Sequence, residues 1–309
     1  MKRMKSSKAI LFVLLVGVAA LGAIGCGSPK SSAEDLSLKV GLMPAVDAVP
    51  VLLAEKNGYF EELGLNVELQ IFNNAQDRQS ALQTDSIDGA ITDLIAVTAN
   101  VEEGFDIKTT TMTNGVFPVL SNEGAEEKKD IKVGMMEVSV TNFLLDEWLG
   151  REYTIEKVYI NDIPARLAAI GSGQLDMGLF PEPMASMGEL NGLTKTLYQS
   201  EEGFCPDVIV FTGKAIAEKE EAIRLFHEAY NKAVDELNQN EQAGRDIIME
   251  KIPNLKPEIE GKIILPEYTR VMIPDDRYID KIIQWTAETM KKELKVKADD
   301  LVERKFAQQ

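Results

Sequence analysis

Apolar residues along the chain follow two spacings, one typical of strands and the other of helices. From Leu38 onward, short runs rich in valine, isoleucine and leucine alternate with stretches in which apolar residues recur every three or four positions. This alternation predicts a mainly parallel sheet covered by helices. The strands are expected at residues 38–43, 66–72, 88–92, 131–136, 155–160 and 176–180, and the helices at 47–57, 75–83, 93–103, 140–149, 164–170 and after Pro183.

Parts of this pattern occur twice along the chain. Leu38–Met43 reads LKVGLM and is echoed by IKVGMM at Ile131–Met136. Ala81–Ile91 is echoed 88 residues later by Ala169–Leu179, and a Lys-Thr pair at 108 recurs at 195. Because the matches keep the same order and nearly the same offset, the chain is expected to contain two related α/β units.

The two units are expected near 36–118 and 119–212, and the pattern changes after them. Residues 215–238 have the apolar spacing of one amphipathic helix, and further helices are expected near 241–250, 276–294 and 298–305. A helical segment of this length must cover one of the two units.

The first 25 residues differ from the rest. Residues 1–8 carry four positive charges, and residues 9–25 carry none. A basic start followed by this apolar run is typical of a secretory signal, since a membrane span needs about 20 apolar residues. Ala23-Ile24-Gly25-Cys26 resembles the lipobox of bacterial lipoproteins, in which the cysteine receives a diacylglyceryl group. We predict a signal peptide at 1–25, a lipid on Cys26 and a polar tether at 26–35; the alternatives are an uncleaved anchor or plain secretion.

Composition excludes several kinds of partner and site. The formal net charge of −17 argues against nucleic acid or an anionic membrane surface as a partner. The sequence has two cysteines and one histidine, too few for a disulfide framework or a cysteine-rich zinc site. We expect His227 to be packed on its helix and Cys205 to be a small, half-buried side chain, with no metal and no cofactor.

Candidate site residues follow from the predicted topology. In parallel sheets, ligands bind beyond the carboxyl ends of the strands, near helix N-termini. Two such units facing each other make a cleft, and the chain would cross between them at a hinge near 114–119 and 205–212. The strand-end loops and the crossings supply the candidates Pro44, Ala45, Asp47, Asp93, Asn114, Phe117, Ser139, Thr141, Tyr159, Phe180, Glu182 and Phe204. Helix capping is the structural alternative for Asp47, Asp93, Ser139 and Thr141.

The charges in these loops indicate a ligand class. The loops hold Asp47, Asp93, Glu137 and Glu182 but no basic residue. We therefore expect an amine or a nitrogen heterocycle, stacked on one of the candidate aromatic rings and donating to the carboxylates. The alternative is a sulfonate or nitrate held by backbone N–H groups at helix starts.

The order of these segments resembles a known family. The stretches VGLMPAVDAVPVLLAEKNGYFEELGLNVELQIF, ALQTDSIDGAIT, IKVGMM and LAAIGSGQLDMGLFPEP are similar to substrate-binding proteins of bacterial ABC importers. The similarity is closest to the group serving nitrate, sulfonates, taurine and thiamine-pyrimidine precursors. It implies a type II periplasmic-binding-protein-like fold, with two doubly wound α/β lobes around a ligand cleft. It also implies that the helical C-terminal segment returns to the first lobe, so that lobe I spans 36–118 plus 213–309 and lobe II spans 119–212.

The resemblance also implies partners and a location. The expected partners are a small-molecule ligand and a permease with its ATPase, bound by a monomer on the outer face of the cytoplasmic membrane. An enzyme of the pyrimidine-forming or menaquinone-pathway type is the competing class, because related folds carry such activities. The loops contain no nucleophile–base pair, and such enzymes act in the cytoplasm, which the lipobox argues against. A lipoprotein acting as an adhesin or signalling partner is a third class.

Overall fold

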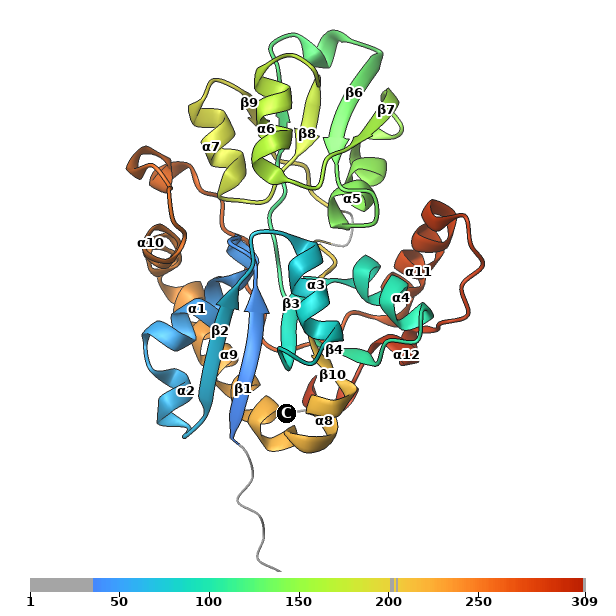
Figure 1. Ribbon diagram of the computed structural model, residues 1–309. Helices are drawn as coiled ribbons and strands as arrows, with labels where there is room; N and C mark the ends of the chain where they lie inside the picture. The colour runs from blue at the N-terminus through green and yellow to red at the C-terminus, as the bar shows by residue number, and fades with distance from the viewer. Residues whose placement is uncertain (1–35, 201–202, 204, 308–309) are drawn as a thin grey trace, which may run out of the picture. The chain divides into compact units, whose positions relative to one another are not determined.

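The computed structural model describes residues 36–307 apart from 201, 202 and 204 (Figure 1). The predicted signal peptide, the tether with Cys26, and the candidate Phe204 lie outside the described residues. Among the residues described, no helix combines the length and apolarity needed to cross a bilayer.

The first sheet is mixed and has five strands. Its order is β2-β1-β3-β10-β4, with β1 parallel to β2 and β3, and β10 antiparallel to β3 and β4. Four of these strands carry mostly buried side chains, since helices cover both faces of the sheet. The strands are β1 (Ser37–Leu42), β2 (Asn66–Ile71), β3 (Gly89–Asp93), β4 (Ile107–Met112) and β10 (Asp207–Thr212).

The second sheet repeats this arrangement. Its order is β7-β6-β8-β5-β9, with β6 parallel to β7 and β8, and β5 antiparallel to β8 and β9. The strands are β5 (Val119–Ser121), β6 (Asp130–Met135), β7 (Thr154–Tyr159), β8 (Met177–Leu179) and β9 (Thr194–Thr196). The Lys-Thr pairs that repeat in the sequence lie in the edge strands β4 and β9, which hold equivalent places in the two sheets.

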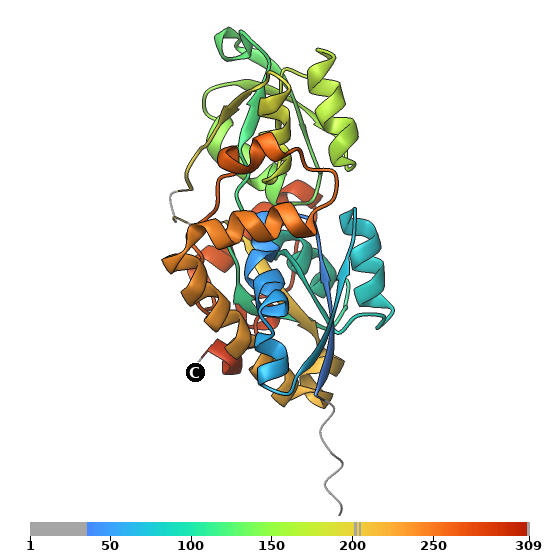
Figure 2. The same cartoon turned by 90° about the vertical axis from the view of Figure 1, so that its left-hand side faces the viewer.

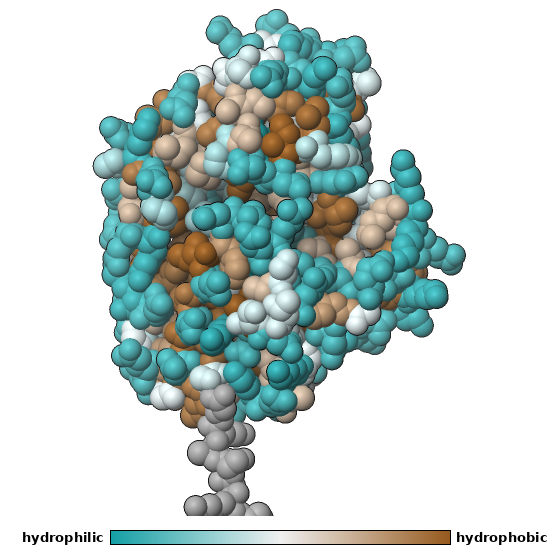
Figure 3. Space-filling view, in the orientation of Figure 1, coloured by the Kyte–Doolittle hydropathy of each residue, from teal (hydrophilic) through white to brown (hydrophobic). Residues whose placement is uncertain are grey.

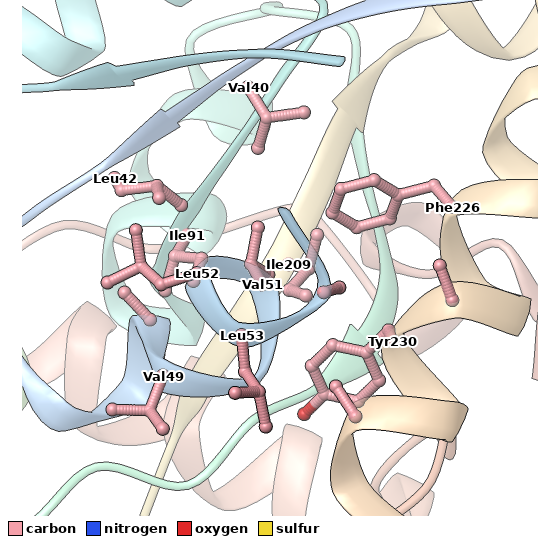
Figure 4. Close-up of a cluster of buried hydrophobic side chains, with 14 of the residues drawn as sticks. Val40, Leu42, Val49, Val51, Leu52, Leu53, Ile91, Ile209, Phe226 and Tyr230 are labelled. Atoms are coloured by element: carbon pink, nitrogen blue, oxygen red, sulfur yellow. The ribbon is translucent and has the colours of Figure 1, made fainter. Parts of the chain in front are cut away.

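Helices on the first sheet enclose the larger core. Strand, α1 and α9 side chains meet there, as Figure 4 shows for Val40, Leu52, Ile209 and Phe226. Full burial of each large apolar side chain stabilises the fold by about 1.5–3 kcal/mol. These helices are α1 (Val49–Lys56), α2 (Tyr59–Glu62), α8 (Gly213–Glu218), α9 (Glu220–Gln239) and α10 (Glu241–Lys251), with the short turn η1 (Val46–Ala48) before α1.

Another set of helices packs beside β3 and β4. Here α11 contacts α4, and α12 contacts both α4 and β4. Their bounds are α3 (Ala75–Gln83), α4 (Leu94–Glu102), α11 (Asp276–Met290) and α12 (Ala298–Leu301), followed by η4 (Arg304–Ala307). The second sheet carries α5 (Val140–Leu149), α6 (Ile163–Gly171) and α7 (Met184–Leu190), with η2 (Ala125–Glu127) after β5.

We call each sheet with the helices packed on it a lobe; lobe I contains the first sheet and lobe II the second. The expected boundary placed residues 207–212 in lobe II, but β10 forms its hydrogen bonds inside the first sheet. All six side chains of β10 are buried there, which explains why this apolar segment pairs in the sheet instead of serving as a flexible hinge. The expected helix at 215–238 is divided into α8 and α9, and the expected helix at 298–305 ends at Leu301.

Candidate functional site

A buried arginine lies where the two lobes face each other. Arg78 on α3 is 6% exposed, and its Nη2 donates to Thr92 Oγ1 at 2.9 Å. Its Nε has no partner among the described residues. Burial lowers the pKa of this guanidinium, and the charges of the Asp93, Asp47 and Asp207 carboxylates oppose that shift. One positive charge is therefore surrounded by three acidic side chains.

Burial dominates the protonation of these acids. It raises the pKa of Asp47 to about 6, although Arg78 acts in the opposite direction. Burial also raises the pKa of Asp93 and, together with the charges of Asp47 and Asp93, raises the pKa of Asp207 well above its usual range. Because acids outnumber the single guanidinium, the cluster either retains protons or attracts a further cation.

Asp93 has two roles in this cluster. Its carboxylate caps α4 by accepting from the Ala96 N–H at 2.8 Å, so the capping interpretation is confirmed. The backbone N–H of Val140, at the start of α5 in lobe II, also lowers its pKa. Asp93 therefore joins the lobes.

Ser139 behaves differently from the capping expectation. It precedes α5, yet its side chain makes no capping hydrogen bond to that helix. Its Oγ lies 2.8 Å from Thr141 Oγ1 instead, and Thr141 Oγ1 accepts from the Met136 N–H at 3.2 Å. These two buried hydroxyls stiffen the loop that leads into α5.

A cleft of about 490 Å³ lies beside the buried cluster. Its walls come from α3 and α4 of lobe I and from the loops that precede α5 and α6 in lobe II. Arg78, Asp93 and Ser139 line it together with Asn100 and Asn161. The volume is in the range of small-molecule sites. The face drawn in Figure 3 is mostly hydrophilic, with apolar patches on both lobes.

The predicted residues do not share one cavity. Asn114 and Phe117 line a second hollow of about 290 Å³, between the chain crossings and α5, with Trp148 and Cys205. Pro44, Ala45, Asp47, Thr141, Tyr159, Phe180 and Glu182 line neither of these two hollows. Tyr159 is 46% exposed at the end of β7, whereas Phe180 is buried beneath the Arg166 guanidinium, 4.9 Å from its ring centroid.

Glu182 is held by protein partners. Its buried carboxylate accepts from Lys195 Nζ at 3.0 Å and from Ser186 Oγ at 2.8 Å. Its backbone N–H donates to Val116 O at 2.9 Å, and its backbone oxygen accepts from the Val46 N–H at 3.1 Å. Lys195 lies 13 residues after Glu182 in the edge strand β9, outside the loops from which the candidate residues were taken. Glu182 therefore lies at the junction of the lobes with its charge already neutralised.

Sequence reasoning missed two arginines. Arg78 and Arg166 occupy equivalent positions in the repeat, 88 residues apart, and both are buried. Each packs beneath a strand glycine: a Cβ on Gly41 would lie 3.4 Å from Arg78 Cγ, and one on Gly134 would lie 3.0 Å from Arg166 Cγ. Counting charges in loops alone overlooked them, because both come from helices. An arginine repeated at one position in both units was the available signal.

Other chemistry-bearing residues are packed into the fold. His227 is buried, which lowers its pKa to about 3, and its Nε2 lies 3.1 Å from Thr110 Oγ1. Burial raises the pKa of the Cys205 thiol, whose sulfur accepts from the Gly115 N–H at 2.9 Å. The described part of the chain contains no cluster of three or more His, Cys, Asp or Glu side chains able to hold a metal ion.

Solved structures share this architecture. A ligand-binding component of an ABC-type import system from Staphylococcus aureus, solved with zinc bound, aligns with a TM-score of 0.74 at 20% identity, over 86% of this chain and 96% of that one. The periplasmic aliphatic sulphonate binding protein of Escherichia coli aligns with a TM-score of 0.70 at 15% identity, over 86% and 92%. The periplasmic nitrate-binding protein of Synechocystis PCC 6803 gives 0.60 at 14%, over 71% and 66%.

These alignments confirm the type II periplasmic-binding-protein-like fold expected from the sequence. No curated protein matched the chain by sequence. The family model described as NMT1/THI5 like matches residues 45–243, which include β2, β3, β4 and β10 of the first sheet, all of lobe II and α9. The match spans more than half of the sequence, and the chain therefore belongs to the NMT1/THI5-like family.

Proposed function

We propose that this protein is the solute-binding component of an ABC importer, which captures a small molecule between its lobes and delivers it to a permease with its ATPase. The observation that carries the proposal is the buried group of Arg78 and three aspartates beside a cleft at the meeting of two lobes. Burying these charges costs free energy, and we attribute their retention to a role in ligand recognition. The similarity to importer components from other bacteria supports the same function.

The ligand is an amine or a nitrogen heterocycle. Three carboxylates face one guanidinium, so a cationic or N–H-rich ligand reduces the repulsion among Asp47, Asp93 and Asp207. Glu182 does not enter this count because Lys195 already neutralises it. The free Nε of Arg78 is the observation that favours the alternative, a sulfonate or nitrate.

Binding fits the described residues better than catalysis. The lone histidine is packed in the core of lobe I, and burial keeps the thiol of Cys205 protonated. The Cys205 thiol donates to Asp207 Oδ2 at 3.3 Å, but burial raises the pKa of both groups, so this pair does not supply the thiolate that a nucleophilic mechanism requires. The enzyme alternative remains a pyrimidine- or menaquinone-pathway-type activity on the same fold.

The location completes the proposal. A signal peptide at 1–25 would direct export, and a lipid on Cys26 would hold the mature protein at the outer face of the cytoplasmic membrane. We expect the protein to be a monomer there. The tether at 26–35 would let the binding lobes stand away from the bilayer.

A thermal-shift screen tests the function. The purified protein is heated with amines, pyrimidines, sulfonates and oxyanions, and a ligand at 100 times its Kd should stabilise the fold by about 2.7 kcal/mol. Stabilisation by an amine or heterocycle supports the proposed ligand class. Stabilisation by sulfonate or nitrate alone would reverse the assignment of ligand charge, and turnover of any compound would favour the enzyme alternative.

A further inference from the structure

A C-terminal segment bridges the two lobes. After α10 the chain forms the short helix η3 (Pro257–Lys262), which packs against both α10 of lobe I and α7 of lobe II, and it joins lobe I again at Tyr268. Figure 2 shows η3 as the dark-orange helix beyond α10, next to the second lobe. We call residues 257–268 the strap.

Polar bonds join the strap to lobe II. Lys195 Nζ donates to the backbone oxygen of Lys262 at 2.7 Å, and the Ile264 N–H donates to Glu182 Oε1 at 3.4 Å. Lys262 Nζ also pairs with Glu189 at 3.1 Å. Because Lys195 also bonds Glu182 and Ser186 within lobe II, it keeps partners there even without the strap.

Apolar contacts join the strap to lobe I. Ile259 and Ile263 are fully buried in the core that α1, α9 and α10 share, against which the half-buried Met187 and Leu190 of α7 also pack. Leu265 lies so close to α10 that a Cβ on Gly244 would come within 2.7 Å of its Cδ1. At the far end, the Tyr268 hydroxyl donates to Val46 O at 2.8 Å.

These two kinds of contact respond differently to separation of the lobes. When the strap moves away from Lys195 and Glu182, water can replace their hydrogen bonds to it at a small net cost in free energy. Exposing Ile259 and Ile263 would instead place apolar surface in water with nothing to offset it. Polar bonds from α10 also hold the strap to lobe I, since Gln242 Nε2 donates to Glu260 Oε1 at 2.7 Å and Arg245 Nη2 donates to Ile263 O at 3.3 Å. The contacts to lobe II are therefore the ones that break first.

We propose that the strap is a latch of the closed arrangement, which remains on lobe I and releases Lys195 and Glu182 when the lobes separate. The same loop supplies a second tie between the lobes, since the Glu182 backbone oxygen accepts from the Val46 N–H. Glu182 and Lys195 are thus positioning residues, and this role rests on the proposed opening and closing of the lobes. It does not depend on which solute is bound.

Distance measurements between spin labels test the latch. Labels are introduced through Glu61→Cys in lobe I, Glu127→Cys in lobe II and Glu258→Cys in the strap, two at a time, in a Cys26→Ser background; all three glutamates are exposed. The test variant is Glu182→Gln with Lys195→Met, which removes both charges of the buried pair; Glu189, the second partner of Lys195, keeps its ion pair with Lys262. The control is Asp85→Asn with Lys214→Met, an exposed pair of lobe I.

The test variant should lengthen the 61–127 and 258–127 distances and leave 61–258 unchanged, whereas the control changes none of them. Unchanged 61–127 distances in the test variant would overturn the latch. Lengthening of 61–258 with a constant 258–127 distance would show that the strap travels with lobe II and would also overturn it.

A second variant keeps the test valid if the double substitution prevents folding. Ile264→Pro keeps Glu182 and Lys195 but removes the N–H that donates to Glu182, along with the half-buried Ile264 side chain, and should give a smaller lengthening in the same direction. If the proposed solute-binding function is wrong, no solute will shorten the 61–127 distance in the parent protein. That result is separate from the outcomes that test the latch.

Discussion

The carboxylate of Asp93 in lobe I lies against the backbone N–H of Val140, the first residue of α5 in lobe II. The Ser139 side chain does not cap α5, and Asp93 from the other lobe supplies a partner for the first N–H of that helix instead. Any ligand of the neighbouring cleft meets a carboxylate that both lobes already hold in place.

Replacing Asp93 tests the ligand's charge. Asp93→Asn keeps the shape but removes the charge, so binding of an amine should weaken about tenfold, or about 1.4 kcal/mol. Calorimetry measures the change, with the exposed Asp85→Asn as control. Tighter binding of a sulfonate or nitrate by Asp93→Asn would show that the site selects anions.

Removing the Arg78 guanidinium should make the folded protein less stable. Arg78→Met leaves the buried Asp93 and Asp207 and the half-buried Asp47 without their counter-ion, and the free energy of unfolding should fall by about 3–5 kcal/mol. Arg270→Met is the matched control, because that arginine pairs with Asp235 at the surface and should cost at most about 1 kcal/mol. Urea titration compares the two variants, and equal losses would contradict a central role for Arg78.

Asp47 makes cation binding depend on pH. Its pKa in the folded protein, about 6, lies above the ordinary value of 3.8, so stability from its protonated form is present below about 4 and is lost as pH rises through 6. A cationic ligand favours the ionised form and should bind more tightly at pH 7.5 than at pH 5. Calorimetry in buffers of different ionisation enthalpy should detect proton release. Asp47→Asn should flatten this dependence; a parent affinity that falls with rising pH would contradict it.

His227 should make the stability of the folded protein fall as the pH decreases, the opposite of the effect of Asp47. Its folded pKa, about 3, lies below the ordinary value of 6.5, so the unfolded chain binds the extra proton between these values. Stability is therefore lost as pH falls from 6.5 toward 3. His227→Gln should show a smaller shift of the urea midpoint between pH 7 and pH 5 than the parent. Equal shifts in both proteins would assign the acid sensitivity to other groups.

Cys26→Ser tests the predicted anchor. Two or more acyl chains hold a protein firmly on a membrane, so the substitution should release the protein or leave an unprocessed precursor. Cell fractionation and N-terminal sequencing distinguish these results. Retention on the membrane with a mature N-terminus still at position 26 would rule out lipidation of this residue.

The sequence predicted the elements that carry a local signal. Strands β1, β2, β3, β6, β7 and β8 lie within one or two residues of their expected positions, because apolar residues recur along them, as at the buried Leu38, Val40 and Leu42. Strands β4, β5, β9 and β10 were not expected as strands. Their pairing joins segments far apart in the sequence, as in Val210 of β10 opposite Ala90 of β3, and no local spacing reports such contacts.

The candidate site was predicted at the level of loops but not of partners. Asp47 and Asp93 do lie in the buried cluster, since strand ends position them. Arg78 could not be found by inspecting loops, and Glu182 appeared free only because Lys195 reaches it from the edge strand β9. Whether a charge faces a ligand depends on side chains that converge from several elements.

The position of β10 has a consequence for the order in which the protein folds. Lobe II receives its antiparallel strand β5 just before β6, so its sheet is complete once residues 119–196 are available. The first sheet lacks the strand between β3 and β4 until Asp207–Thr212 arrives. As the chain folds from its N-terminus, lobe II can therefore form while lobe I still exposes an open edge at β3, which makes β10 the strand whose arrival protects the chain from aggregation.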